Sequence, residues 1–243
     1  MGYGIRFTAA ANSDVNNDQS TIDNVNIAQF SQAGIAIEHS NSLLHQINGG
    51  RIAYGPVGVR LRGGSFQMNG TSLFVAKTEF EFLDPVGTLW GRNSAGYYHA
   101  SMIQNVSTES SSAGKPALLT TTSWPGSAAR SSEALGISVF ITNYNKKGGP
   151  QDGRPVIEYK SAGTLSIMNS MLHFAPNSQI SITDPRADVS FFANRVFGLD
   201  RIRWSGCLKS SNNFYYYHWA RQPNAGAIFM QSGDNFELTY QVF

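Results

Sequence analysis

Two glutamates that alternate with phenylalanines have the type and spacing that come closest to chemistry in this sequence. Glu79 and Glu81 alternate with Phe80 and Phe82, and a period of two residues is typical of a β-strand with one buried face. Both carboxylates would then point outward from one strand, roughly 7 Å apart. Carboxyl groups about 6.5–9.5 Å apart serve as general acid and general base in inverting glycoside hydrolases. The two glutamates are therefore the candidates for a catalytic pair.

An ion-pair ladder is the alternative interpretation of this region. Arg60 lies 21 residues before Glu81, and Arg62 lies 24 residues after Glu38; both spacings recur in the repeat described below. Each pair would lie side by side on neighbouring strands, where a surface ion pair contributes about 1 kcal/mol at most. A neighbouring cation also lowers the pKa of a carboxyl group, whereas a general acid needs a raised pKa. We favour the ion-pair interpretation.

Other reactive side chains show no catalytic or ligand motif. Asp184 and Asp188 flank Pro185 and Arg186, which indicates a turn. Cys207 stands in no nucleophile motif and is expected to be a packed thiol. The histidines share no spacing typical of metal ligands and are expected at the surface or at an interface; they are His39, His45, His99, His173 and His218. The sequence therefore predicts no metal, no cofactor and no enzyme activity.

Composition excludes several classes of protein. Only 14% of the 243 residues are charged, against about 25% in typical soluble domains. The 18 basic and 16 acidic residues give a net charge of +2 and no basic stripe, so no nucleic-acid partner is expected. One cysteine excludes a disulfide framework, and the lack of an apolar run of about 18 residues predicts no membrane insertion. Residues 1–8 lack the features of a secretory signal.

A repeat of 21–26 residues organises most of the chain. Asn24, Asn48 and Asn69 are spaced by 24 and 21 residues. The same shifts align four apolar columns, which are Ala28–Ile52–Leu73, Phe30–Tyr54–Val75, Ile35–Val59–Phe80 and Ile37–Leu61–Phe82. Later repeats place an apolar residue two positions before Asn105, Asn143, Asn169 and Asn194, through Ile103, Ile141, Ile167 and Phe192. A fixed period of this length made of short alternating segments predicts stacked strands.

The repeated asparagines have a structural explanation. Asparagine and glycine are the residues that most readily adopt the left-handed conformation needed at a tight corner, and stacked amides can hydrogen-bond to one another. We therefore expect an asparagine ladder formed by Asn24, Asn48, Asn69, Asn105, Asn143, Asn169 and Asn194. The two long intervals, of 36 and 38 residues, predict loops inserted at about 84–98 and 107–133.

These features predict an all-β protein, a right-handed parallel β-helix of about seven to eight coils. The leucine-rich alternative lacks its consensus. Residues 1–20 are expected to form an N-terminal arm or cap, residues 21–205 the β-helix, and residues 206–243 a β-rich aromatic cap or oligomerisation element. Aromatic residues are enriched in protein interfaces, so the candidate interface residues are Phe214, Tyr215, Tyr216, Tyr217 and Trp219.

Aromatic residues in the inserted loops suggest a second kind of contact. Trp90, Tyr97, Tyr98 and Trp124 lie in or near these loops. Exposed rings could stack on glycans, and the same rings could equally be buried between subunits. The sequence leaves both alternatives open.

The pattern of residues 22–37, Ile-Asp-Asn-Val-Asn-Ile-Ala-Gln-Phe-Ser-Gln-Ala-Gly-Ile-Ala-Ile, resembles right-handed parallel β-helices of the pectate-lyase-like superfamily. It is most similar to those of bacteriophage tailspikes and related virion proteins, over about residues 20–205. No catalytic motif of that superfamily is matched. The resemblance implies a homotrimer that contacts other virion proteins of the capsid or tail.

Two functions are therefore compared. The expected one is a non-enzymatic structural protein of a phage virion, either a capsid-decorating or cement protein or a short spike. The alternative is a tailspike-type protein that binds, or depolymerises, a host surface glycan. The missing signal, the missing acidic constellation and the early start of the repeat, which leaves no room for a particle-binding head, all favour the first.

Overall fold

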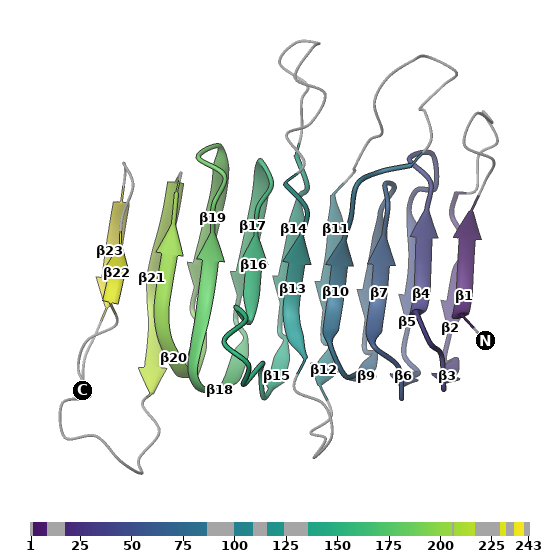
Figure 1. Cartoon of the computed structure of the whole chain (residues 1–243), viewed down its shortest axis with the longest axis horizontal. Helices are drawn as coiled ribbons and strands as arrows, with labels where there is room; N and C mark the ends of the chain where they lie inside the picture. The colour runs from purple at the N-terminus through teal and green to yellow at the C-terminus, as the bar shows by residue number, and fades with distance from the viewer. Residues whose placement is uncertain are drawn as a thin grey trace.

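The protein is a stack of parallel strands. The computed structural model describes residues 2–8, 18–86, 100–108, 116–123, 136–205, 207–216, 229–231 and 236–240. Regular secondary structure in these ranges is entirely β, and its 23 strands join into one sheet. The strands follow one another along the long axis from the N-terminus to the C-terminus (Figure 1). The predicted all-β parallel fold is thereby confirmed.

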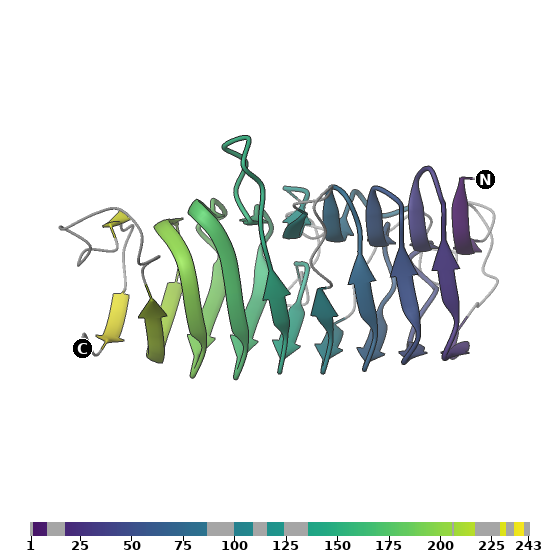
Figure 2. The same cartoon turned by 90° about the horizontal axis from the view of Figure 1, so that it is seen from below.

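Successive turns of the chain contribute strands to three rows, which Figure 2 shows from below. The first row contains β2 (Thr21–Asp23), β5 (His45–Asn48), β8 (Phe66–Asn69), β11 (Ser101–Gln104), β14 (Val139–Thr142), β17 (Gly163–Met168), β19 (Ala187–Phe192), β21 (Cys207–Tyr216) and β23 (Phe236–Tyr240). Together the rows enclose a single elongated core.

The second row is made of short strands. It contains β3 (Asn26–Ala28), β6 (Arg51–Ala53), β9 (Ser72–Phe74), β12 (Ser107–Thr108), β15 (Asn145–Lys147), the first halves of β18 (Met171–Ile182) and β20 (Arg195–Trp204), and the last three residues of β21. The third row contains β1 (Tyr3–Thr8), β4 (Ala33–Glu38), β7 (Val57–Leu61), β10 (Thr78–Phe82), β13 (Ala117–Thr121), β16 (Ile157–Tyr159), the second halves of β18 and β20, and β22 (Phe229–Gln231).

Alternation of apolar and polar residues builds the first row. In each of its strands β5, β8, β11 and β14, the first and third residues are buried and the second is exposed. Parallel pairing in register stacks the buried residues on one another, as in the column Ile47–Met68–Ile103–Ile141–Ile167–Phe191. Each member of that column is at most 3% exposed. A residue's burial is therefore set by its column.

The corner between the first and second rows contains a left-handed residue in each of the seven turns from β2 to β19. Values of φ between 51° and 70° occur at Asn24, Gly49, Gly70, Asn105, Asn143, Asn169 and Ala193. The predicted corner column is therefore wrong at three positions. Asn48 and Asn69 stand one residue before the corner, and Asn194 stands one residue after it. Glycine takes their place at two corners because it has no Cβ to oppose a positive φ.

Some of the expected amide ladder is present beside this corner. Asn105 donates through Nδ2 to Oδ1 of Asn69 (2.8 Å), and Asn143 donates to Oδ1 of Asn105 (3.2 Å). Asn48 donates instead to Asp23 (2.9 Å). Asn194 is buried, and its side chain accepts from the Ser170 amide and donates to the Ile167 carbonyl.

The predicted apolar columns are correct in the third row and shifted elsewhere. Ile35–Val59–Phe80 and Ile37–Leu61–Phe82 pair as expected. Ile52 pairs with Leu73 but with Ile27 rather than Ala28. Likewise, Ile167 pairs with Phe191 rather than Phe192. Tyr54 is 55% exposed and left-handed, so it does not continue a buried column from Phe30. In the first turn, the segment between the second-row strand and the third-row strand is one residue longer than in the second turn. A prediction that uses one constant spacing therefore misses this shift.

The predicted domain limits do not coincide with the limits of the stack. Residues 3–8 form β1, which pairs with β4 as a rung of the third row rather than as an arm. Parallel pairing also continues past residue 205 through β21, β22 and β23. Within the second expected insertion, β13 pairs with both β10 and β16 and so belongs to the stack.

Comparison of two glycines with the same backbone conformation tests how closely successive turns approach each other. Gly50 and Gly70 have φ values of 72° and 70°. A Cβ on Gly50 would lie 2.3 Å from the Val25 carbonyl oxygen, whereas one on Gly70 would meet nothing nearer than 3.9 Å. Gly70→Ala is expected to cost about 1–2 kcal/mol for the left-handed conformation, and Gly50→Ala about 1–3 kcal/mol more for the clash. Denaturant unfolding measures both, and equal losses would contradict the packing.

Candidate functional site

The two candidate catalytic glutamates do not form a pair. Glu79 points into the core and is 0% exposed, whereas Glu81 lies outside and binds Arg60 (Nε–Oε2 2.6 Å). The prediction that both carboxylates point outward is wrong. The first three residues of β10, Thr78, Glu79 and Phe80, are all buried, so strict alternation does not hold at the start of this strand. The predicted partner of Glu81 is correct, but Glu38 binds Arg6 rather than Arg62.

Glu79 is the centre of a polar cluster inside the solenoid. Its Oε1 accepts hydrogen bonds from Thr108 Oγ1 (2.6 Å) and Lys146 Nζ (3.1 Å), and its Oε2 accepts one from Tyr144 Oη (2.7 Å). Both carboxylate oxygens thus have donors. We call Glu79, Thr108, Tyr144 and Lys146 the core cluster. Its members are at most 2% exposed.

The register of the stack brings the core cluster together. Thr108 and Lys146 occupy a column of the second row whose other members include Ile52, Leu73 and Leu172. Two consecutive turns therefore place polar residues where the others place apolar ones. Glu79 faces them across the core from the third row. Sequence reasoning missed Thr108, Tyr144 and Lys146; a polar residue in an otherwise apolar column was the signal that could have revealed them.

Charges in the core cluster depend on one another. Burial lowers the pKa of Lys146, and the charge of Glu79 opposes that effect. Burial also raises the pKa of Tyr144 well above its usual value, with a further contribution from the charge of Glu79. A buried pair of this kind contributes little net stability, but loss of one partner leaves an uncompensated charge. The hydrogen bonds of the core cluster connect the second and third rows, and they form only when the two rows keep this register.

A second polar group contains a serine and a histidine. Ser42 Oγ lies 2.7 Å from Nε2 of His45, which is the contact by which a histidine can activate a serine nucleophile. Burial lowers the pKa of His45, so its ring is neutral near pH 7, and the ring stacks on Phe7 with centroids 4.2 Å apart. The expectation of a surface or interface position is wrong for His45 and for His39, both of which are 0% exposed.

Three observations argue against a catalytic triad at this corner. The Asp18 carboxylate accepts from the Leu43 amide (2.6 Å). The described residues provide no hydrogen-bond partner for Nδ1 of His45, the atom that a triad carboxylate would hold. Ser42 itself is 0% exposed. In this geometry the serine and histidine pack the corner beside β4 and β5.

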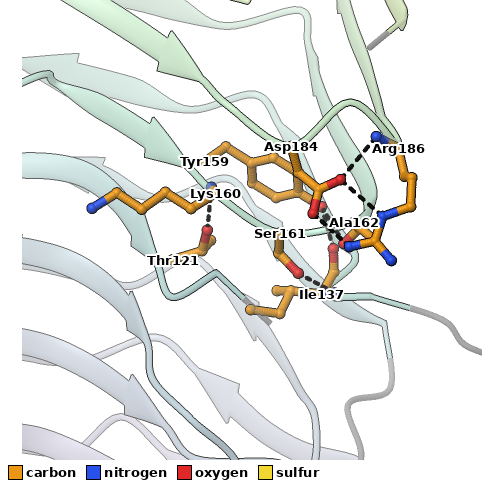
Figure 3. A network of polar contacts seen from close by, with 8 residues as sticks. All are labelled: Thr121, Ile137, Tyr159, Lys160, Ser161, Ala162, Asp184 and Arg186. Carbon is orange, nitrogen blue, oxygen red and sulfur yellow. Dashed lines mark hydrogen bonds and ion pairs between the residues drawn. The ribbon is translucent and has the colours of Figure 1, made fainter. Parts of the chain in front are cut away.

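A third polar network closes the turn predicted at Asp184 (Figure 3). Asp184 accepts from the Arg186 amide (2.8 Å) and binds its guanidinium through both oxygens (3.0 and 2.8 Å). These contacts lower the pKa of Asp184, so it is an ionised turn residue rather than a general acid. Tyr159 donates to the Ile137 carbonyl, and burial raises the pKa of this phenol.

An aromatic platform lies on the outer side of the second row. Tyr54 and Phe74 meet edge to face, with ring centroids 5.1 Å apart. The guanidinium of Arg51 lies 5.4 Å from the centroid of each ring. We call these three residues the aromatic platform. Because Tyr54 is 55% exposed, part of its ring is open to a ligand in solution beside the partly exposed Arg51.

Several predicted residues lie outside the part of the chain that the structure describes. These are the glycan-binding candidates Trp90, Tyr97, Tyr98 and Trp124 and the interface candidates Tyr217 and Trp219. Phe214, Tyr215 and Tyr216 belong to β21, where they pair with Arg195, Val196 and Phe197 of β20.

The described ranges contain no group of three or more His, Cys, Asp or Glu side chains placed to hold a metal ion. The same ranges contain no helix long and apolar enough to cross a membrane. Comparison of the chain with family models, curated proteins and solved structures found no match.

Removal of one charge from the core cluster tests its coupling. Glu79→Gln is expected to destabilise the protein by about 3–5 kcal/mol, because it leaves the Lys146 ammonium buried without its counter-charge. The double variant Glu79→Gln/Lys146→Met should regain more than half of that loss, since Met suits the apolar column. Glu81→Gln, at the outward ion pair, is the matched control and should cost about 1 kcal/mol or less. The denaturant midpoints of unfolding measure these changes in stability. Equal losses of stability in Glu79→Gln and Glu81→Gln would refute the buried cluster.

His45 should make stability depend on pH. Its folded-state pKa is lowered, so below about pH 6.5 the unfolded chain binds more protons than the folded one. The free energy of unfolding should therefore decrease as pH falls from 7 to 5. His45→Gln should flatten this slope. Urea unfolding at several pH values measures the slope, and an unaltered slope in His45→Gln would contradict the assignment.

Proposed function

We propose that this chain is a right-handed parallel β-helix of about seven to eight coils that serves as a non-enzymatic structural protein of a phage virion. In this role it is a capsid-decorating or cement protein, or a short spike, and it acts as a homotrimer. The observation that carries the proposal is the placement of the acids. Glu79, Glu81 and Asp184 each bind a cation of their own chain in a structural contact.

Mechanical resistance is the property that such a role needs. Each internal rung hydrogen-bonds to the rung before it and the rung after it, as β7 does with β4 and β10. The same geometry stacks apolar residues along the core. Separation of two rungs therefore breaks backbone hydrogen bonds and exposes two apolar layers together. Binding to a particle would add stability by mass action.

Glycan binding is the second candidate, and the aromatic platform favours it. An exposed tyrosine ring beside an arginine can stack on a sugar ring while the guanidinium binds its hydroxyl or carboxyl groups. This site lies on the stack itself, unlike the loop aromatics expected from the sequence. The same protein can decorate a particle and contact a host surface glycan.

An assay on polysaccharides separates these functions from depolymerisation. The purified chain is incubated with a panel of neutral and acidic bacterial polysaccharides. We expect no new reducing ends and no unsaturated uronate products, because Glu79, Glu81 and Asp184 are each held in an ion pair. Products that disappear in Glu81→Gln would overturn the proposal in favour of an enzyme.

Binding to the same panel tests the second candidate. If the platform binds glycan, Tyr54→Ala should weaken retention on the bound polysaccharide at least tenfold, whereas Thr120→Ala, on the third row, should not. Retention that is equal in all three proteins removes the platform as a glycan site. Cryo-imaging of a virion that carries the protein, with density at symmetric capsid positions, would support the structural role directly.

A further inference from the structure

The outward face of the first row carries no charge over five successive strands, from β5 to β17, and a single charge, Asp188, on β19. We call the uncharged residues of this face from β5 to β19 the neutral strip; they are Gln46, Asn48, Gln67, Asn69, Met102, Gln104, Phe140, Thr142, Ser166 (5% exposed), Met168, Ser190 and Phe192. Charge resumes only at its ends. Asp23 precedes it on β2, and Asp188 at the start of β19 binds Lys209 on β21 (3.5 Å).

The third row shows what a solvated face of this protein looks like. Ion pairs cross it between neighbouring strands, with Arg6 bound to Glu38 and Arg60 bound to Glu81. Another pair joins Lys160 to Glu158 beside β16. The third row therefore carries ion pairs of a kind that β5 to β17 of the first row lack. A surface depleted of charge and carrying apolar side chains is typical of the core of a protein interface.

Apolar side chains cluster in the middle of the neutral strip. Met102, Phe140 and Met168 are 42%, 37% and 36% exposed. Met102 and Phe140 lie directly opposite each other on β11 and β14, and Met168 follows on β17 beside Thr142. Amide side chains continue the strip on the N-terminal side through Gln67 and Asn69. The strip therefore has an apolar centre and a polar, uncharged margin.

The chemistry of the strip identifies its occupant as another copy of the same chain. A charged partner would find no opposite charge to bind. An amide is both a donor and an acceptor, so a surface of Gln and Asn can hydrogen-bond to an identical surface, which a surface of one charge cannot do. In a trimer, a strip that runs along the three-fold axis meets the same strip of the other two copies. We propose that the neutral strip is the surface through which copies of this chain associate.

The size of the strip sets the expected strength of association. Six strands about 4.8 Å apart and four residues wide cover roughly 25 by 13 Å, or about 300 Å². A standard interface buries about 800 Å² on each partner. Association through the strip alone should therefore be weak and concentration-dependent, in the micromolar range or above. This inference rests on the homo-oligomer proposed above and names its contact surface.

Charge insertion tests the surface. Phe140→Lys places a cation at the centre of the strip, and Thr120→Lys places one on the third row between Glu81 and Glu158, where it is accommodated. Light scattering coupled to size exclusion, from 1 to 500 µM, measures the mass. We expect Phe140→Lys to raise the concentration for half-association at least tenfold and Thr120→Lys to leave it unchanged. Circular dichroism and the melting temperature report whether each variant is folded.

Disulfide cross-linking gives a second measurement with nearly native proteins. In a Cys207→Ser background, Gln67→Cys and Thr120→Cys each provide one surface thiol, and mild oxidation joins copies whose thiols meet. Covalent multimers from Gln67→Cys but not from Thr120→Cys support the inference. An oligomer that persists in Phe140→Lys and cross-links only through Thr120→Cys overturns the strip while leaving the proposed homotrimer standing. A chain that is monomeric at 500 µM and cross-links at neither position overturns both.

Discussion

In-register parallel pairing between successive turns is the constraint on which the rest of this structure depends. Because each strand hydrogen-bonds to its equivalent one turn earlier, equivalent side chains stack in columns and share one environment. A column that is buried in one turn is buried in the next, and a left-handed corner recurs at the same place. The repeat therefore restricts each position to residues that suit its column, which accounts for both the apolar stacks and the glycine and asparagine corners.

Polar residues inside such a stack must be matched in space. Glu79 enters a column that is glycine in the two preceding turns and leucine in the next. The carboxylate is tolerated because Thr108, Tyr144 and Lys146 supply three donors at the same level of the core. Any other register between the second and third rows would separate these groups and bury a bare charge. The cluster thus selects one register at little net gain in stability.

The few charged residues of this protein are unevenly distributed over its three rows. Ion pairs occupy the third row, an arginine flanked by two rings occupies the second, and the central first row carries amides and apolar side chains. Like charges stacked about 4.8 Å apart would repel one another, and the ion pairs of the stack join opposite charges either on adjacent turns or two residues apart in one turn. The three faces consequently differ in chemistry and suit different contacts: water on the third row, a ligand at the aromatic platform, and another copy of the chain at the neutral strip.

The sequence by itself determined the all-β parallel architecture, two apolar columns of the third row and the outward pairing of Arg60 with Glu81, because these depend only on period and alternation. It did not determine the corner column, since Asn48 and Asn69 lie one residue from the left-handed position that glycine occupies. Nor did it reveal that Glu79 points inward, because strict alternation does not hold at the start of β10, where three adjacent residues are all buried. Thr108, Tyr144 and Lys146 are 29, 65 and 67 residues from Glu79. Only the tertiary structure decides their contact, because it depends on which turns of the solenoid lie at the same level and which side chains face one another across the core.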